Sequence, residues 1–240
     1  MLSIIIPTLN EEKTIENTIK SLKKLSDYEY EIIISDGKST DKTVEIAKKY
    51  GAKVMVYKGV VRQTIGGGRN FGAFIASGDF LVFLDADVTI PDMNNFFKKA
   101  LLNFEGNPRL VGITSKVKVL PEFEKFSDRI NFGFINSIHR LANNILHIGM
   151  AMGEFQMLKR KTFEALGGFN EKIVVAEDQE FFRRLSRFGI TRLPKNLTVY
   201  HTGRRIHKLG WIRMWIQWMT NGLFVAFFNK SLSKEWKVIR

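Results

Sequence analysis

The sequence contains no cysteine among its 240 residues. This absence excludes disulfide bonds, thiolate metal sites and cysteine nucleophiles, and it is typical of proteins from a reducing compartment. Any bound metal ion must therefore be held by oxygen or imidazole ligands. The N-terminus also lacks the basic region and the cleavage site of a secretion signal, because Met1 leads directly into the apolar residues 3–7. We therefore expect a cytoplasmic protein.

Long uninterrupted apolar segments, internal repeats, low-complexity tracts and linkers are also missing from the sequence. The most apolar stretch, residues 211–228, is interrupted by polar side chains, so it falls short of the ~18 or more apolar residues that a transmembrane helix requires. A chain of 240 residues with 45% hydrophobic content is long enough for one sizeable core and too short for two comfortable domains. We therefore expect one globular unit with appendages.

The formal net charge is +13, which calls for an anionic partner. About half of this excess lies in residues 201–240, where eight basic residues accompany a single acid, Glu235. These basic residues are Arg204, Arg205, Lys208, Arg213, Lys230, Lys234, Lys237 and Arg240. Charge alone leaves nucleic acid, phospholipid headgroups and phosphorylated substrates open as partners.

Short apolar runs alternate with helical patterns through the first ninety residues. The runs predict strands at residues 3–7, 30–35, 52–57 and 80–84, and the patterns between them predict helices at residues 11–25, 41–50 and 68–76. The runs are too continuous for half-solvated antiparallel strands, so they indicate a buried parallel sheet. Repeated strand–helix units of this length predict an α/β layered domain with right-handed crossovers.

Polar residues collect where three of these predicted strands end. Residues 7–12 follow the first strand, residues 36–41 the second and residues 85–87 the fourth, and each segment contains acids. Because ligands bind beyond the carboxyl ends of parallel strands, we expect a single cleft. Asp85 and Asp87 suit a hard divalent cation that in turn binds a diphosphate, although aspartate pairs in loops are as often structural. Residues 39–41 are better explained as a helix cap.

Four segments resemble family 2 glycosyltransferases in order, spacing and strand context: residues 3–12, 33–43, 68–72 and 84–87. The resemblance extends over about 200 residues. It implies a Rossmann-like GT-A fold of the α/β class, with a mostly parallel central sheet flanked by helices, and an inverting transfer from a UDP- or GDP-type nucleotide sugar. By this resemblance the donor is bound by Pro7, Leu9, Glu11, Asp36, Arg69, Asp85 and Ala86, and a divalent metal ion, Mn²⁺ or Mg²⁺, by Asp87 with Asp85.

The later half extends the resemblance through an acceptor-side pattern in residues 153–156 and 163–170 and a Glu-Asp motif in residues 176–181. The motif implies that Asp178, next to Glu177, is the general base that takes a proton from an acceptor hydroxyl. The alternative is that both carboxylates stabilise the first turn of a helix. If the acceptor is a lipid phosphate, which is already ionised, Asp178 need not act as a base.

Three residues beyond the predicted strands are further candidates for the donor site. His201 can complete the metal site through a neutral imidazole, but a lone histidine is more often structural. Arg204 and Arg205 can bind the diphosphate from a mobile loop.

The sequence departs from the family pattern in the nucleoside pocket. Leu9 stands where an aromatic residue is frequent, Ser35 and Asp36 replace a double acid, and Lys38 occupies an unusual place. Because of these departures, the sequence does not identify the base of the donor nucleotide. The Gln-x-x-Arg-Trp signature of processive synthases is absent, which favours the transfer of a single sugar.

Three competing functions fit the sequence less well. A dinucleotide fingerprint fails because Phe71 stands where a glycine is required after Gly66 and Gly68. A nucleotidyltransferase would carry a glycine-rich, arginine-containing loop at residues 10–12, where the chain instead has Asn-Glu-Glu. A nucleic-acid-binding module predicts a basic stripe with stacking aromatics, whereas the tryptophans of the tail form a helical apolar face, so we expect no nucleic-acid partner.

Two amphipathic segments suggest contact with a membrane. We expect a catalytic domain over residues 1–205, with a nucleotide-sugar half (1–90) and an acceptor half (91–205) that contains an amphipathic helix at residues 122–149. Residues 206–240 form a basic, Trp-rich amphipathic segment suited to the cytoplasmic face of an anionic membrane. The acceptor is then a polyprenyl phosphate or a lipid-linked glycan. The alternatives are a soluble acceptor and packing of this segment on the domain or a partner subunit.

Overall fold

The computed structural model describes residues 1–236 and residue 239 of the chain. Two basic residues of the predicted charged tail, Lys237 and Arg240, lie outside the described residues. Strands and helices alternate along the first half of the chain, as the sequence predicts.

In the described part of the chain, a seven-stranded sheet has the strand order β3-β2-β1-β4-β7-β5-β8. Strands β1 to β4 pair in parallel, β5 and β8 also pair in parallel, and β7 is antiparallel to both of its neighbours. The prediction of a mostly parallel α/β sheet is therefore confirmed. The strands are β1 (Leu2–Thr8), β2 (Tyr30–Asp36), β3 (Lys53–Val56), β4 (Phe80–Leu84), β5 (Leu110–Thr114), β7 (Phe155–Lys159) and β8 (Ile190–Arg192).

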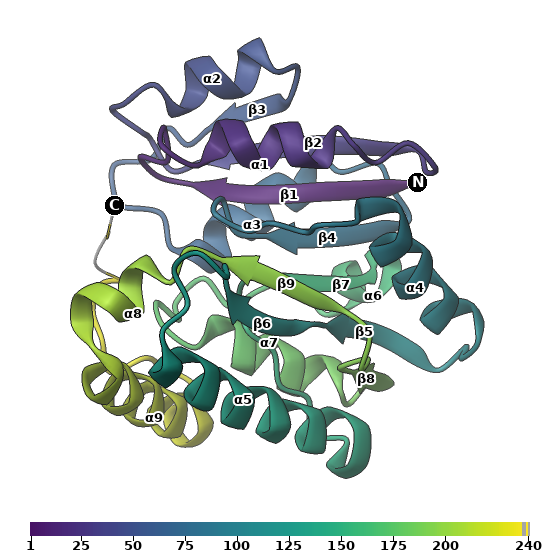
Figure 1. Ribbon diagram of the computed structural model, residues 1–240, viewed down its shortest axis with the longest axis vertical. Helices are drawn as coiled ribbons and strands as arrows, with labels where there is room; N and C mark the ends of the chain where they lie inside the picture. Colours follow the sequence, from purple (N-terminus) through teal and green to yellow (C-terminus); the bar gives the residue numbers. More distant parts are fainter. Residues whose placement is uncertain (237–238, 240) are drawn as a thin grey trace.

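Helices cover both faces of this sheet, because successive residues of a strand point to opposite faces (Figure 1). On β1, Ile4 and Ile6 pack in one core cluster with residues of α1 (Ile15–Leu22), α2 (Thr43–Lys49) and α4 (Met93–Glu105). Ile5 packs in a second cluster on the other face, with residues of α3 (Ile65–Phe74), α6 (Arg160–Ala165) and α7 (Glu177–Leu185). A further parallel strand pair, β6 (Lys116–Val119) and β9 (Thr198–His201), leads into the second half of the molecule.

Helix α3 begins at Ile65, earlier than the predicted start at Gly68. The prediction was wrong because three glycines occupy the first turn, and glycine is a poor helix former. Thr64 caps this turn with its side chain, which accepts a hydrogen bond from a backbone N–H of the turn at 3.0 Å. Glycine also lets the helix lie close to β1, since a Cβ on Gly72 would sit 2.5 Å from Ile5 Cγ2.

Helix α1 begins at Ile15 rather than at Glu11, the predicted start. Asn10 adopts a left-handed conformation with φ of 57°, and Glu11 N donates a hydrogen bond to Thr43 Oγ1 at 2.7 Å. The segment after β1 is therefore a turn tied to the start of α2. This turn keeps Glu11 at the carboxyl end of the sheet.

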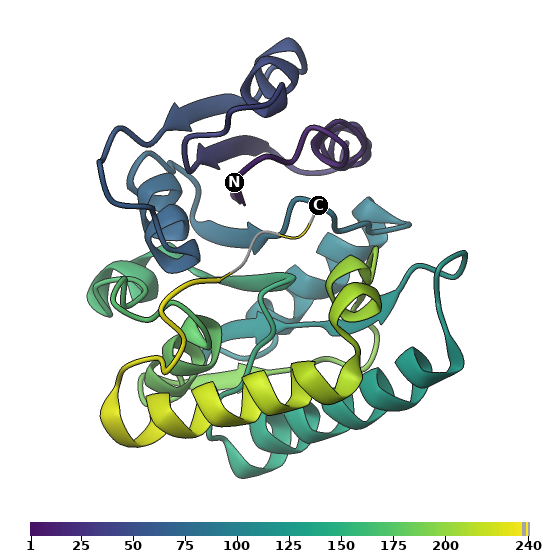
Figure 2. The same ribbon diagram turned by 90° about the vertical axis from the view of Figure 1, so that its left-hand side faces the viewer.

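The predicted amphipathic helix at residues 122–149 is shorter than expected and consists of α5 (Phe126–Leu141), continued by the π-helix η1 (Ala142–Leu146). Helices α8 (Arg204–Leu209) and α9 (Trp211–Phe228) follow β9. Figures 1 and 2 show α5 and α9 side by side on one flank of the molecule. Trp215 joins them, since its indole N–H donates to Asn131 Oδ1 at 2.7 Å.

The apolar stripes of α5 and α9 point outward into solvent. The outer apolar face, as we call it, consists of exposed residues from both helices: Phe126, Ile130, Phe134, Ile138, Ile212, Ile216, Met219 and Leu223. The opposite, polar side of α5 faces inward, where Asp128 accepts hydrogen bonds from Trp211 Nε1 at 2.8 Å and from Lys125 N at 2.9 Å. None of the helices in the described residues is long and apolar enough to span a membrane.

After α9 the chain turns back toward the carboxyl ends of the strands (Figure 2). The Ser231 hydroxyl accepts a hydrogen bond from Val174 N at 2.6 Å, and the Trp236 carbonyl accepts one from Arg62 at 3.0 Å. The last described residues therefore lie beside the loop that precedes α3.

Candidate active site

The carboxyl ends of β1, β2 and β4 open into one cavity of about 1300 Å³. The cavity continues past α7 into the space between α5 and α9. Most residues that the sequence assigns to the site line this cavity: Pro7, Leu9, Glu11, Arg69, Asp85, Ala86, Asp87, Glu177, Asp178, His201, Arg204 and Arg205. The expected single cleft is therefore present.

Asp36 is the exception among the predicted donor-binding residues. It is fully buried and does not line the cavity. Its carboxylate accepts hydrogen bonds from Thr8 Oγ1 at 2.9 Å and from the backbone N–H groups of Lys38 at 3.1 Å and Ser39 at 2.8 Å. Asp36 therefore fixes the loop after β2, and the neighbouring Gly37 lines the cavity instead.

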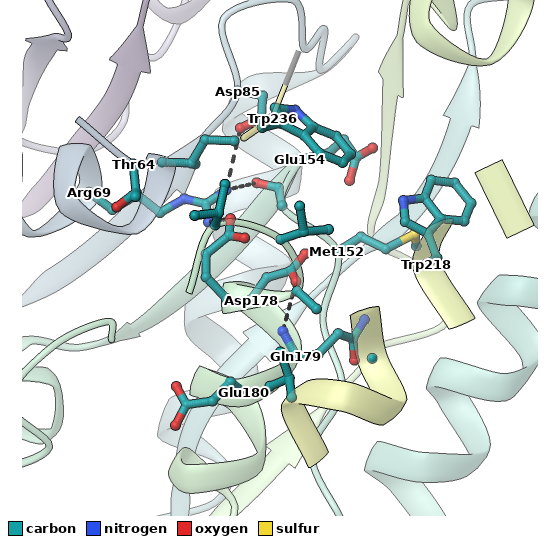
Figure 3. A pocket seen from close by; sticks show the side chains of 18 of the residues that line it. Thr64, Arg69, Asp85, Met152, Glu154, Asp178, Gln179, Glu180, Trp218 and Trp236 are labelled. Atoms are coloured by element: carbon teal, nitrogen blue, oxygen red, sulfur yellow. Dashed lines mark hydrogen bonds and ion pairs between the residues drawn. The ribbon is translucent and has the colours of Figure 1, made fainter. Parts of the chain in front are cut away.

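Arg69 links the donor end of the cavity to the start of α7. Its side chain is 1% exposed and forms ion pairs with Glu177 Oε1 at 2.8 Å and with Asp85 Oδ1 at 3.5 Å. Arg69 Nη2 also donates to the Gly153 carbonyl at 3.2 Å. Figure 3 shows the side chains of Arg69, Asp85 and Asp178 in the same part of the cavity.

Asp178 is the second residue of α7 and lines the cavity directly. Gln179 N donates to its Oδ1 at 2.8 Å. Burial and the adjacent Glu177 raise the pKa of Asp178 above its ordinary value, while Arg69 acts in the opposite direction. A carboxylate with a raised pKa is a stronger base, so this position suits proton transfer near neutral pH.

Glu154 is a site residue to which the sequence analysis assigned no role. Its side chain lines the cavity beside Asp178, and burial together with the nearby Asp85 raises the pKa of Glu154. The acceptor-side pattern of residues 153–156 was the available signal for it. Met152, Trp218 and Trp236 also line the cavity, and their apolar character in the sequence did not distinguish them from core residues.

Arg204 connects the acid after β1 with the acid pair after β4. Its guanidinium makes a bidentate contact with Glu11, at 2.8 Å to each carboxylate oxygen, and its Nε lies 3.3 Å from Asp87 Oδ2. The Thr202 hydroxyl also donates to Asp87 Oδ2, at 2.7 Å. Arg205 lies over the Trp236 ring, 3.7 Å from its centroid. Both arginines therefore border the donor end.

Asp85 and Asp87 provide the hard oxygen ligands that Mg²⁺ and Mn²⁺ prefer. No group of three or more His, Asp or Glu side chains within residues 1–236 or residue 239 is arranged to hold a metal ion. Magnesium commonly binds one or two carboxylates and completes its shell with substrate phosphates and water. The aspartate pair therefore fits a cation that is shared with a bound diphosphate.

His201 lies beside this acid pair at the end of β9. Burial lowers the pKa of His201, which keeps its imidazole neutral, and its Nε2 is buried without a hydrogen-bond partner among the described residues. The ring packs edge-on against Phe132, with centroids 5.2 Å apart. Its role as a metal ligand stays a prediction.

Residues 3–167 match the family model described as glycosyl transferase family 2. The succinoglycan biosynthesis protein ExoA of Rhizobium meliloti is 27% identical over 217 residues, which cover 87% of this chain and 65% of ExoA.

Two solved structures share the fold at low sequence identity. A mannosyltransferase of Pyrobaculum calidifontis, PcManGT, in complex with GDP-Man and Mn²⁺, has a TM-score of 0.71 at 20% identity, covering 92% of this chain and 61% of its own. Glucosyl-3-phosphoglycerate synthase of Mycobacterium tuberculosis, in complex with Mn²⁺, UDP and glucosyl-3-phosphoglycerate, has a TM-score of 0.62 at 22% identity. This match covers 97% of our chain and 81% of the synthase chain. The chain spans less than two thirds of ExoA and of PcManGT.

Proposed function

The chain belongs to glycosyl transferase family 2, and from this premise we propose that it transfers a single sugar from a nucleotide-diphosphate sugar to an acceptor at a membrane surface. The observation that carries this proposal is the Arg69 contact with both Asp85 and Glu177, because it holds the donor end and the base Asp178 in one cavity.

The donor nucleotide belongs at the carboxyl ends of β1 and β4. This end is lined by Pro7, Leu9, Glu11, Asp85, Ala86 and Asp87. Related folds have been solved with GDP-Man and with UDP, so both nucleotide classes are candidates. Arg204 and Arg205 border the same end and supply the cations that a diphosphate requires.

Asp87 and Asp85 are the residues that would hold a divalent cation, Mn²⁺ or Mg²⁺, with His201 as a further candidate ligand. Such a cation, when bound, neutralises the charge that develops on the departing diphosphate. Arg204 now contacts Asp87, so we expect its guanidinium to move toward the diphosphate when the donor binds.

In this proposal Asp178 acts as the general base. As the acceptor oxygen attacks the anomeric carbon, its proton passes to the Asp178 carboxylate and the bond from that carbon to the phosphate oxygen breaks. The nucleoside diphosphate leaves with the electron pair. Attack from the face opposite the leaving group inverts the anomeric centre. Glu177, held by Arg69 at 2.8 Å, positions the start of α7 for this step.

The outer apolar face supports a membrane-bound acceptor. Contiguous exposed apolar side chains on two neighbouring helices mark an interaction surface. Exposed basic residues lie just before α5, on α8 and on α9: Lys125, Lys208 and Arg213. Their charge complements anionic headgroups, which favours attachment to a membrane face over packing against a second protein.

Calorimetric titration tests the donor site. UDP and GDP should be titrated into the protein with Mn²⁺ and with chelator, and one nucleotide should bind in a metal-dependent manner. Asp87→Ala should remove the metal-dependent part of nucleotide binding. Asp79→Ala, which changes an aspartate with a 79% exposed side chain, should leave that binding unchanged. If neither nucleotide binds to the folded protein, the proposed function is wrong.

A further inference from the structure

The cavity does not end at the predicted base. Beyond Asp178 it continues between α5, α7 and α9 as a passage that we call the chain channel. The channel is lined on the α9 side by Met214, Trp218, Met219, Gly222 and Leu223, together with Met152, and on the α7 side by the polar residues Gln179, Glu180 and Arg183. We propose that the acceptor is a neutral hydroxyl carried by an amphiphile, whose apolar chain lies in the chain channel while the hydroxyl reaches Asp178. This inference rests on the proposed function and narrows its acceptor.

The chain channel and the carboxylates of Asp178 and Glu154 belong to one continuous cavity. Asp178 and Glu154 line the same cavity as Met152 and Trp218, and Figure 3 shows Met152 between these carboxylates and Trp218. A sugar-accepting headgroup at Asp178 therefore has an apolar surface directly beside it. Apolar lining of this kind binds a hydrocarbon chain through the hydrophobic effect.

The other end of the chain channel opens on the outer apolar face. Ile138, Met219 and Leu223 line the cavity, and they are also 36%, 55% and 55% exposed. These three residues therefore belong both to the cavity and to the outer apolar face, and in our proposal a chain from a bilayer beneath this face enters beside them. The membrane surface and the reaction centre are then the two ends of one passage.

The charges at the junction favour a hydroxyl over a phosphate. Asp178 and Glu154 are both acids, and the guanidinium nearest to them, Arg69, is already paired with Glu177 and Asp85. A second anion there would be repelled by Asp178 in its ionised form, which is the form that acts as the base. A hydroxyl, in contrast, can donate its proton to Asp178.

Besides Arg69, six Lys and Arg residues among the described residues line the cavity: Arg62, Arg183, Arg187, Arg204, Arg205 and Lys234. Two of these follow Asp178 on or just after α7. Arg183 and Arg187 follow Asp178 by five and nine residues. Arg183 Nη1 donates to the Ala226 carbonyl of α9 at 3.4 Å, and Arg187 follows the end of α7. The Arg183 guanidinium therefore points to α9, on the channel side of the cavity.

Binding of two bromoalkyl probes tests the inference, because bromine quenches tryptophan fluorescence at short range and Trp218 lines the channel. The probes are 12-bromododecanol and 12-bromododecyl phosphate, used below their aggregation thresholds. The alcohol should quench in a saturable manner, and the phosphate should bind at least about 10-fold more weakly. Tighter binding of the phosphate would overturn the choice of a hydroxyl.

Two matched glycine substitutions distinguish binding of the alcohol in the chain channel from binding at the protein surface. Gly222 and Gly133 lie in α9 and α5, and a Cβ built on either meets no atom within 4 Å, but only Gly222 lines the cavity. Gly222→Leu should weaken alcohol binding at least about 10-fold by filling the channel, while Gly133→Leu should leave it unchanged. Equal effects of both substitutions, or no saturable quenching, would overturn the channel.

Nucleotide titration of the same samples distinguishes this inference from the proposed function. If UDP or GDP binds while the alcohol does not, the chain channel is wrong and the donor site stands. If neither nucleotide binds to the folded protein, the proposed function is wrong, and the inference about the chain channel loses its premise.

Discussion

Arg69 and Glu177 form a buried ion pair of 2.8 Å, although 108 residues separate them in the sequence. Arg69 comes from α3, which packs on β1, and Glu177 opens α7, which carries Asp178. The pair therefore joins the donor half of the cavity to the residue that we assign as the base. Its loss should disturb both stability and catalysis.

We predict that Arg69→Met lowers the free energy of unfolding by about 3–5 kcal/mol, because Glu177 is then a buried charge without its partner. Urea denaturation followed by circular dichroism measures the change. The double variant Arg69→Met/Glu177→Gln should lose less than the sum of the two single losses. Strict additivity would show that the two side chains do not stabilise each other.

Arg204 should contribute to binding of the diphosphate. It now contacts Glu11 and Asp87, two acids of the donor end. Arg204→Gln should weaken the binding of UDP or GDP about 10-fold, since it removes a charge-assisted contact to phosphate. Binding of uridine or guanosine, which lack the diphosphate, is the control and should change little. An equal loss for the nucleoside would assign Arg204 to shaping the pocket.

His139 should contribute stability that is lost in mild acid. Burial lowers the pKa of His139 to about 4, below the ordinary value of about 6.5 in an unfolded chain. Between these values the unfolded chain binds more protons, so this contribution is complete above pH 6.5 and is lost as the pH falls toward 4. This contribution of His139 should fall by about 2 kcal/mol between pH 7 and pH 5, whereas the raised pKa values of Asp178 and Glu154 act in the opposite direction.

Denaturation of the wild type and of His139→Leu at pH 7 and pH 5 measures this effect. Between pH 7 and pH 5 the free energy of unfolding of the variant should change by about 2 kcal/mol in the stabilising direction relative to the wild type. An identical change in both proteins would show that His139 does not contribute to the pH dependence.

The outer apolar face should bind anionic vesicles. Ile216→Glu places a charge on this face, where the native side chain is 59% exposed, and should reduce co-sedimentation with phosphatidylserine vesicles several-fold. Leu102→Glu is the matched control, because Leu102 is 52% exposed on α4, away from that face. If Ile216→Glu instead converts a dimer to a monomer and leaves vesicle binding intact, the face is a subunit interface.

The sequence predicted the first four strands closely because each is a buried apolar run that ends in polar residues. The acid-bearing segments after β1 and β4 line the cavity, as parallel-sheet geometry requires. The inward position of Asp36 could not be predicted, since its hydrogen bonds to Lys38 and Ser39 depend on the conformation of the loop.

The orientation of α5 was also beyond the reach of the sequence. A periodic stripe shows that one side of a helix is apolar, but it does not say whether that side faces the core or the exterior. Phe134 faces outward, whereas Asn136, a polar residue two positions later, is buried and hydrogen-bonds to the backbone of Val117. Such inward polar contacts can be predicted only when the position of the partner strand, here β6, is known.

The assignment of Asp178 as the general base is tested most directly by the rate of sugar transfer. The rate is measured for the wild type and for Asp178→Asn, with the nucleotide sugar that binds and an alkyl-linked hydroxyl acceptor. The amide keeps the shape of the side chain and cannot take the proton, so the rate should fall at least about 100-fold while donor binding is kept. The wild-type product should carry an inverted anomeric centre by NMR. A variant that transfers sugar within a few-fold of the wild-type rate would contradict the assignment of Asp178 as the base.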